Sequence, residues 1–149
     1  MTFLTLFVVI PVVMLLALWL ARNDSQVRGV MVVGSTALLA LAIYLVLAFV
    51  NARETMPAEQ YPFLFGTAIP WFEPLNIYYR TGVDGISVVM LLLSSIIVFT
   101  GTFASWQMQP MKKEYFLWFV LLSTGVFGFF ISKDLFTMFM FYEVALIPM

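Results

Sequence analysis

The sequence predicts an all-α fold, a polytopic transmembrane helix bundle, and three observations lead to this fold class. Of the 149 residues, 63% are hydrophobic and only 10% are charged, whereas soluble domains carry about 25% charged residues. The mean hydropathy is +1.03. The apolar residues form runs long enough to cross a bilayer core of ~30 Å. We therefore expect about five helices, over residues 2–21, 29–50, 86–106, 115–131 and 135–149.

The first apolar run is expected to be a retained helix and not a signal peptide. No Lys or Arg precedes Arg22, and the run is longer than the ~7 to 15 residues of a signal-peptide core. Pro11 lies inside this run, and a proline within a helix removes one backbone hydrogen bond. The second run, 29–50, contains no proline.

Basic residues beside the short connections predict the topology. Arg22 and Arg28 flank the first connection, and Lys112 and Lys113 lie in the third. Because cytoplasmic loops carry an excess of Lys and Arg, these two connections are predicted to be cytoplasmic. The N-terminus and segment 51–81 would then face the outer side.

Segment 51–81 is expected to be an interfacial loop that lies folded on the membrane surface. It is long for a loop without structure of its own, and aromatic rings are typical of the headgroup zone. Its prolines are Pro57, Pro62, Pro70 and Pro74, and its aromatic residues include Trp71, Phe72, Tyr78 and Tyr79. We assign it no chemistry.

Two carboxylates are predicted to begin helices. Asp84 precedes the third apolar run and Asp134 precedes the fifth. A carboxylate at a helix N-terminus accepts hydrogen bonds from free backbone N–H groups and complements the helix dipole. Capping therefore accounts for both residues without transport chemistry.

Small residues at helical spacing predict packing seams in the third and fourth helices. Thr124, Gly128 and Ser132 recur every four residues, and helices in lipid associate where small side chains let their backbones approach. A second pair, Gly101 and Ser105, has the same spacing. The alternative is that Thr124 or Ser132 holds water in a proton path.

Glu143 is the strongest candidate for a functional residue. It lies nine residues after Asp134 (143 − 134), which places it about 13 Å into a helix, near the middle of a ~30 Å hydrocarbon core. A charged side chain at that depth costs roughly 2.5 to 3.5 kcal/mol on insertion scales, so an intramembrane carboxylate indicates proton or ion movement. Pro148 would free the carbonyl of Val144 beside it.

The residue types that are missing also limit the function. The chain contains no Cys and no His, the side chains that hold iron–sulfur clusters, haem and zinc. We therefore expect no cofactor and no metal in this chain. A net charge of −1 gives no reason to expect nucleic acid as a partner.

Four stretches of the sequence carry a family resemblance. They are Gly82-Val-Asp-Gly-Ile-Ser87, Lys113-Glu-Tyr-Phe116, Asp134-Leu-Phe136 and Phe141-Tyr-Glu-Val-Ala-Leu-Ile-Pro-Met149. Together they resemble the subunit M family of bacterial NADH-quinone oxidoreductase, respiratory complex I. The match is specific from about Arg80 to the end of the chain.

The resemblance implies an antiporter-like subunit of about fourteen helices in the bacterial inner membrane. The fifth apolar run has 15 residues (149 − 134), about 22 Å of helix, so the chain is expected to be an N-terminal fragment that ends inside a span. The family couples NADH oxidation and quinone reduction to proton translocation through a buried glutamate, which maps onto Glu143, and intramembrane lysines. Redox chemistry belongs to other subunits, and the partners are neighbouring antiporter-like subunits and the lipid bilayer.

Two other interpretations stay open. The chain is also compatible with a subunit of a multisubunit cation/proton antiporter or of a membrane-bound hydrogenase, which would use the same carboxylate. A structural membrane fragment that is inactive by itself is the third possibility, and absence of proton flux through the chain alone in liposomes would identify it.

Overall fold

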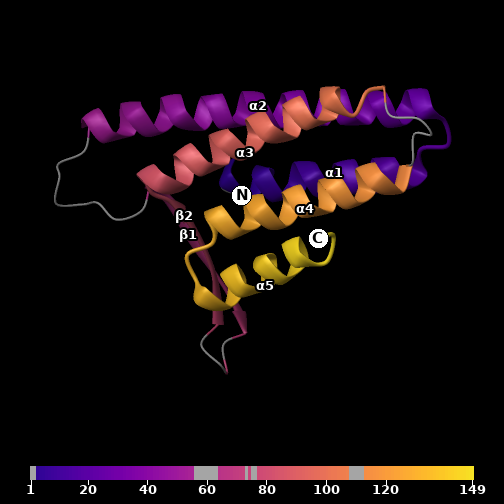
Figure 1. The fold of residues 1–149 in the computed structure, drawn as a ribbon. Coiled ribbons are helices and arrows are strands. Elements are labelled where there is room, and N and C mark those ends of the chain that lie inside the picture. Colours follow the sequence, from indigo (N-terminus) through magenta and orange to yellow (C-terminus); the bar gives the residue numbers. More distant parts are fainter. Residues whose placement is uncertain (1–2, 56–63, 73, 75–76, 108–112) are drawn as a thin grey trace.

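The computed structural model describes residues 3–55, 64–72, 74, 77–107 and 113–149. These residues form five α-helices and one two-stranded sheet, which confirms the predicted helix bundle (Figure 1). The chain begins with a short 3-10 helix, Phe3–Thr5. The other elements are α1 (Leu6–Leu20), α2 (Asp24–Thr55), β1 (Leu64–Phe72), β2 (Ile77–Val83), α3 (Gly85–Ala104), α4 (Lys113–Ile131) and α5 (Leu135–Leu146).

The second helix is longer than the expected 29–50. α2 has 32 residues, about 48 Å of helix, so it extends well beyond a ~30 Å core. No proline lies among the polar residues at its two ends, so these residues can continue the helix. Among the described residues, four helical segments are long and apolar enough to cross a membrane, namely Phe3–Leu20, Asp24–Glu54, Gly85–Ala104 and Lys113–Ile131, while α5 is shorter.

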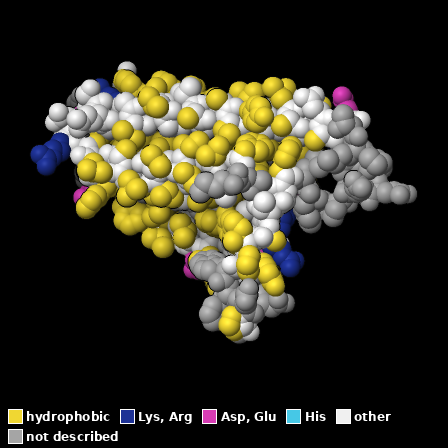
Figure 2. Space-filling model, turned by 180° about the vertical axis from the view of Figure 1, so that it is seen from behind, with side chains coloured by type: hydrophobic (Ala, Val, Ile, Leu, Met, Phe, Trp, Pro, Cys, Tyr) yellow, Lys and Arg dark blue, Asp and Glu magenta, His cyan; other side chains and the backbone are white. Residues whose placement is uncertain are grey.

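The helices pack as neighbours in a bundle. α2 lies against α1 and α3, α4 lies against α1 and α3, and α5 packs on α4 at the edge of the bundle (Figure 1). The core lies between these helices, where the rings of Phe7 and Phe127 are 5.7 Å apart and both side chains are fully buried. Figure 2 shows hydrophobic side chains along the helices and Lys and Arg side chains toward the two ends of the bundle.

The segment 51–81, expected to lie folded on the membrane surface, contains the end of α2 and a hairpin, and its place at the membrane surface stays a prediction. Residues 51–55 complete α2, and β1 and β2 form an antiparallel hairpin in which Thr67 pairs with Thr81, their hydroxyl oxygens 2.8 Å apart. Pro70 lies within β1 opposite Tyr78; in a two-stranded sheet both strands are edges, where proline is tolerated. Pro57, Pro62 and the side chains of Trp71 and Phe72 lie outside the described residues.

The hairpin is tied to the helices at one end of the bundle. Thr81 of β2 forms a bridge with Ser132, and the backbone N–H of Lys133 donates to the carbonyl of Arg80 at 2.8 Å. The ammonium of Lys133 lies 3.6 Å from the carboxylate of Asp84. One lysine therefore joins the α4–α5 connection, the hairpin and the start of α3.

Both predicted caps are confirmed. The carboxylate of Asp84 accepts from the backbone N–H of Ser87 at 2.9 Å, and that of Asp134 accepts from the backbone N–H of Phe136 at 3.2 Å. Lys113, one of the basic residues from which the topology was predicted, donates to the carbonyls of Trp19 (2.6 Å) and Ala21 (2.8 Å). These carbonyls belong to the C-terminal end of α1, which lacks partners within its own helix.

The Asp84 cap predicts a pH-dependent contribution to stability. Its pKa is lowered from the ordinary value of 3.8, first by the hydrogen bond from the Ser87 side chain and then by the Ser87 backbone N–H and the charge of Lys133, against desolvation. Because the carboxyl pKa is lower in the folded state, this contribution is present above pH 3.8 and is lost as the pH falls through the lowered folded value. We expect Asp84→Ala to destabilise the detergent-solubilised chain by about 1 kcal/mol at pH 7.

Thermal unfolding at pH 7 and pH 3 measures this effect. The difference between wild type and Asp84→Ala should shrink at the lower pH. Asp24→Ala, which removes a carboxylate from the first turn of α2, serves as the control and should show a smaller loss. An equal deficit of Asp84→Ala at both pH values would contradict a contribution from the ionised cap.

Candidate functional site

Glu143 lies in the last part of α5, the helix that begins after the Asp134 cap. It is nine residues beyond that cap (143 − 134), about 13 Å along the helix. The backbone carbonyl of Glu143 accepts from the N–H of Ile147 at 3.3 Å, in the last turn of the helix. The helix therefore carries the carboxylate well beyond the cap, and its depth in a membrane stays a prediction.

The close approach of α4 fixes the position of α5. A Cβ added to Gly125 would lie 2.6 Å from the backbone nitrogen and 2.8 Å from the Cα of Ala145, and one added to Gly128 would collide with the ring of Phe141. Real Cβ atoms do not approach backbone this closely, so only glycine allows the contact. The predicted seam in the fourth helix is confirmed as a packing surface for α5.

The hydroxyls of this seam are satisfied within α4. Thr124 donates to the carbonyl of Val120 at 2.8 Å, and Ser132 donates to that of Gly128 at 2.6 Å. The second predicted seam also packs, because a Cβ on Gly101 would lie 2.8 Å from the ring of Phe119. These contacts support packing over the alternative that Thr124 or Ser132 holds water.

The side chain of Glu143 points away from the bundle. It is exposed, and on a helix its neighbours are the residues three, four and seven positions away. These neighbours are apolar and at least partly exposed as well, namely Phe136, Phe139, Met140, Leu146 and Ile147. The carboxylate therefore occupies the centre of an outward, apolar face of α5, which we call the Glu143 face.

Glu143 has no side-chain partner among the described residues. Three cations make contacts elsewhere: Lys113 at the end of α1, Lys133 at Asp84, and Arg28 at Trp106. An ionised carboxylate that faced lipid at this depth would cost roughly 2.5 to 3.5 kcal/mol or more. A polar or cationic group over this face would remove that cost.

α5 ends at Leu146, so Pro148, which was expected inside the fifth helix, follows its last residue. Proline has no N–H to continue the hydrogen-bond ladder, so the last α-helical bond is the one from Ile147 to Glu143. Pro11, in contrast, lies inside α1 as predicted.

A cavity of about 300 Å³ lies between β2 and α5, and Met140 of the Glu143 face forms part of its wall. Its walls are Tyr79, Thr137, Met140, Phe141 and Val144. The Thr137 hydroxyl is buried and has no hydrogen-bond partner among the described residues, and burial raises the pKa of Tyr79. Sequence reasoning missed Thr137, because nothing in the pattern predicted that a hairpin strand would lie over α5.

The described residues contain no group of three or more His, Cys, Asp or Glu placed to hold a metal ion. The carboxylates Asp84 and Asp134 lie at helix starts, where they act as caps. The candidate site is thus a single carboxylate in an apolar face. Such a site can bind and release a proton, or pair with a cation from another segment.

No family model matches the chain, but individual relatives do. It is 40% identical over 83 residues to NADH-quinone oxidoreductase subunit M of Buchnera aphidicola from Acyrthosiphon pisum, over 54% of this chain and 16% of the relative. The same subunit of Buchnera from Schizaphis graminum is 31% identical over 118 residues, 78% of this chain and 23% of the relative. F(420)H(2) dehydrogenase subunit M of Methanosarcina mazei is 24% identical over 146 residues, 97% of this chain and 28% of the relative.

The fold is also similar to solved structures. Respiratory complex I from Thermus thermophilus with bound NADH contains a chain that matches with a TM-score of 0.76 and 25% identity, over 97% of this chain and 27% of that one. A chain of the archaeal membrane-bound sulfane sulfur reductase matches with a TM-score of 0.75 and 17% identity, over 99% and 29%; this second match shows the fold alone. The chain spans between 16% and 28% of the length of the curated relatives above.

The predicted resemblance to subunit M is therefore confirmed in sequence and in fold. Together with the four apolar helices, these matches indicate a multi-pass membrane protein related to the antiporter-like subunits of respiratory complexes. The role of Glu143 is not tested by them and stays a prediction.

The position of α5 predicts the effect of adding one methyl group to the seam. Gly125→Ala should destabilise the chain by about 1 to 3 kcal/mol, because the backbone of α5 must move to admit the new Cβ. Gly85→Ala is the matched control, since nothing lies within 4 Å of its added Cβ. Thermal unfolding in detergent compares the two, and equal stability of both variants would mean that α5 does not pack as closely as the structure shows.

Proposed function

We propose that this chain is part of a membrane subunit of an NADH-quinone oxidoreductase, in which Glu143 takes part in proton translocation. The observation that carries the proposal is the lone carboxylate at the centre of the outward, apolar Glu143 face, without a cation among the described residues. The relatives named subunit M supply the redox context. We place the subunit in the bacterial inner membrane, beside the other membrane subunits of the complex.

The proposed mechanism uses the two states of a carboxyl group. Apolar surroundings favour its neutral form, and a nearby cation favours the carboxylate. A lysine that approaches Glu143 during turnover would make the group release its proton, and withdrawal of the lysine would make it bind another. That lysine would lie on a segment that covers the Glu143 face.

We further propose that this chain contributes no redox centre. Glu143 would change its proton or its ion pair while electrons pass through other subunits. Coupling then requires a mechanical or electrostatic connection between the redox site and the membrane helices. The chain by itself would translocate no protons.

A second candidate function has specific support. The matches to an F(420)H(2) dehydrogenase subunit and to the sulfane sulfur reductase complex indicate that this arrangement of helices occurs beside different redox modules. The chain could serve a complex that uses another electron donor, or a cation/proton antiporter or hydrogenase, with the same carboxylate. Proton uptake by membrane vesicles with NADH, and separately with other donors or a sodium gradient, distinguishes these functions.

Replacement of Glu143 by Gln tests the proposed role. Gln keeps the shape and the hydrogen-bonding capacity but cannot release a proton at physiological pH. We expect NADH-driven proton uptake into inverted membrane vesicles to fall by at least about tenfold, equivalent to ~1.4 kcal/mol, while the complex still assembles. Assembly is checked by native gel electrophoresis.

Glu114→Gln is the matched control, because Glu114 is exposed in the first turn of α4 at a membrane boundary. It should retain proton uptake close to that of wild type. Full proton uptake by assembled Glu143→Gln complex would exclude Glu143 from the proton path.

A further inference from the structure

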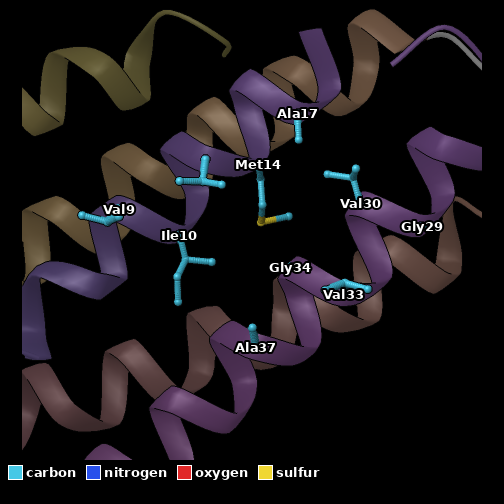
Figure 3. A pocket seen from close by; sticks show the side chains of 10 residues that line it. Val9, Ile10, Met14, Ala17, Gly29, Val30, Val33, Gly34 and Ala37 are labelled. Atoms are coloured by element: carbon cyan, nitrogen blue, oxygen red, sulfur yellow. The ribbon is translucent and has the colours of Figure 1, made fainter. Parts of the chain in front are cut away.

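An apolar groove runs along the outside of α1 and α2, far from the Glu143 face. Its volume is about 450 Å³. Figure 3 shows Met14 pointing between the two helices toward Gly34, with aliphatic side chains around it. The walls include Ile10, Val13 and Ala17 from α1 and Val30, Val33 and Ala37 from α2.

A second hollow continues this groove toward the end of the bundle. Its walls are Ser25, Arg28, Gly29, Val32 and Trp106, and its volume is about 460 Å³. Gly29 lines both hollows, and nothing lies within 4 Å of the position where its Cβ would be. The missing side chain leaves the surface open between the apolar groove and the pocket that contains Arg28.

Arg28 brings unused hydrogen-bond donors to this pocket. Its guanidinium carbon lies 5.3 Å from the centre of the Trp106 ring, and Nη2 donates to the Trp106 carbonyl at 3.3 Å. Nε is buried and has no partner among the described residues. A guanidinium has five N–H donors, four of them on the terminal nitrogens, so three terminal N–H groups remain beyond the bond to the Trp106 carbonyl.

The charge of the pocket is positive. None of its five lining residues is acidic, and Asp24, one turn before Arg28 on α2, is not part of the wall. The planar guanidinium matches the geometry of phosphate and binds it through paired hydrogen bonds. An anionic, phosphate-bearing group therefore complements this end of the groove.

The pocket lies at one end of the bundle, near the start of α2 and the end of α3. Arg28 is four residues after the start of α2 (28 − 24), about 6 Å along the helix, and Trp106 follows the end of α3 at Ala104. Trp and Arg are typical of the membrane interface. The apolar groove, which begins at Gly29 and continues to Ala37, leads from this interface toward the hydrocarbon core.

We propose that the groove and the pocket together bind one anionic phospholipid, with its phosphate on Arg28 and one acyl chain along α1 and α2. Basic pockets between transmembrane helices are suited to anionic headgroups, and the aliphatic walls match an acyl chain. The apolar groove adjoins the cationic pocket at Gly29, and one phospholipid would occupy both, whereas an apolar helix of another polypeptide would leave Arg28 without an anionic partner.

Photolabelling in native membranes tests the proposal. Membrane vesicles from cells that make the chain are supplied with phosphatidylglycerol that carries a diazirine in one acyl chain, and the adducts are mapped by mass spectrometry after irradiation. We expect adducts on Val13, Val33 and Ala37. Arg28→Gln should reduce them by about tenfold, a factor typical of a lost hydrogen bond to a charged group.

Matched controls separate loss of the site from loss of the fold. Arg22→Gln removes a charge from the same end of the bundle but outside both hollows, and labelling should stay within about twofold of wild type. Ala37→Phe fills the groove and leaves Arg28 intact, so it should also reduce labelling. Val89→Phe places the same ring on an exposed position of α3 and should leave labelling unchanged.

Three results would overturn the proposal. The first is equal labelling of the groove in wild type and Arg28→Gln. The second is competition by unlabelled phosphatidylcholine that is as effective as competition by phosphatidylglycerol. The third is absence of groove adducts in wild type, as expected if another polypeptide fills the groove.

Discussion

The contact between α4 and α5 determines where Glu143 lies. Gly125 and Gly128 let the backbone and ring of α5 residues approach α4 to distances that any side chain would prevent. In lipid, where helices gain little from hydrophobic burial against each other, such close packing is a main source of association. Because this seam occupies one side of α5, Glu143 necessarily points to another side, away from the bundle. The carboxylate is therefore available to a partner outside the described helices.

The start of α5 is also held in place, at the end of the bundle. Lys133 immediately precedes the Asp134 cap and connects, through its backbone and its ammonium, to Arg80 of β2 and Asp84 before α3. The hairpin, the third helix and the fifth helix thus share one junction outside the apolar spans. A displacement of the hairpin would be transmitted to α5 through this junction. It would thereby change the position of Glu143 relative to the segment that covers it.

Sequence reasoning predicted the parts of this structure that depend on local chemistry. The Asp84 and Asp134 caps and the glycine seam of α4 follow from residue type and spacing alone. It did not predict the hairpin, because the aromatic residues of segment 51–81 were interpreted as those of an interfacial loop, and the pairing of β1 with β2 depends on contacts between separate segments. It also missed Thr137, whose burial depends on the strand that crosses α5. Sequence pattern and propensity do not predict features that depend on contacts between distant segments.

The orientation of Glu143 was the harder part of the site. Its depth follows from counting residues after Asp134, but the direction of its side chain follows only from which side of α5 packs on α4. Within this chain the carboxylate is exposed. Burial in the membrane must therefore be distinguished from burial in protein. The first is a matter of depth along a helix, and the second needs a covering segment with a cation or polar group.

The two candidate sites lie at opposite edges of the bundle. α5, with its Glu143 face, packs on α4 alone among the long helices, while the lipid groove lies on α1 and α2 (Figure 1). A phospholipid on the groove would therefore leave the Glu143 face free for protein. Since residues without shared partners contribute independently to free energy, the charge at Arg28 and the charge at Glu143 can be altered separately. The two proposals, a lipid on α1 and α2 and a covering segment on α5, can therefore be tested independently of each other.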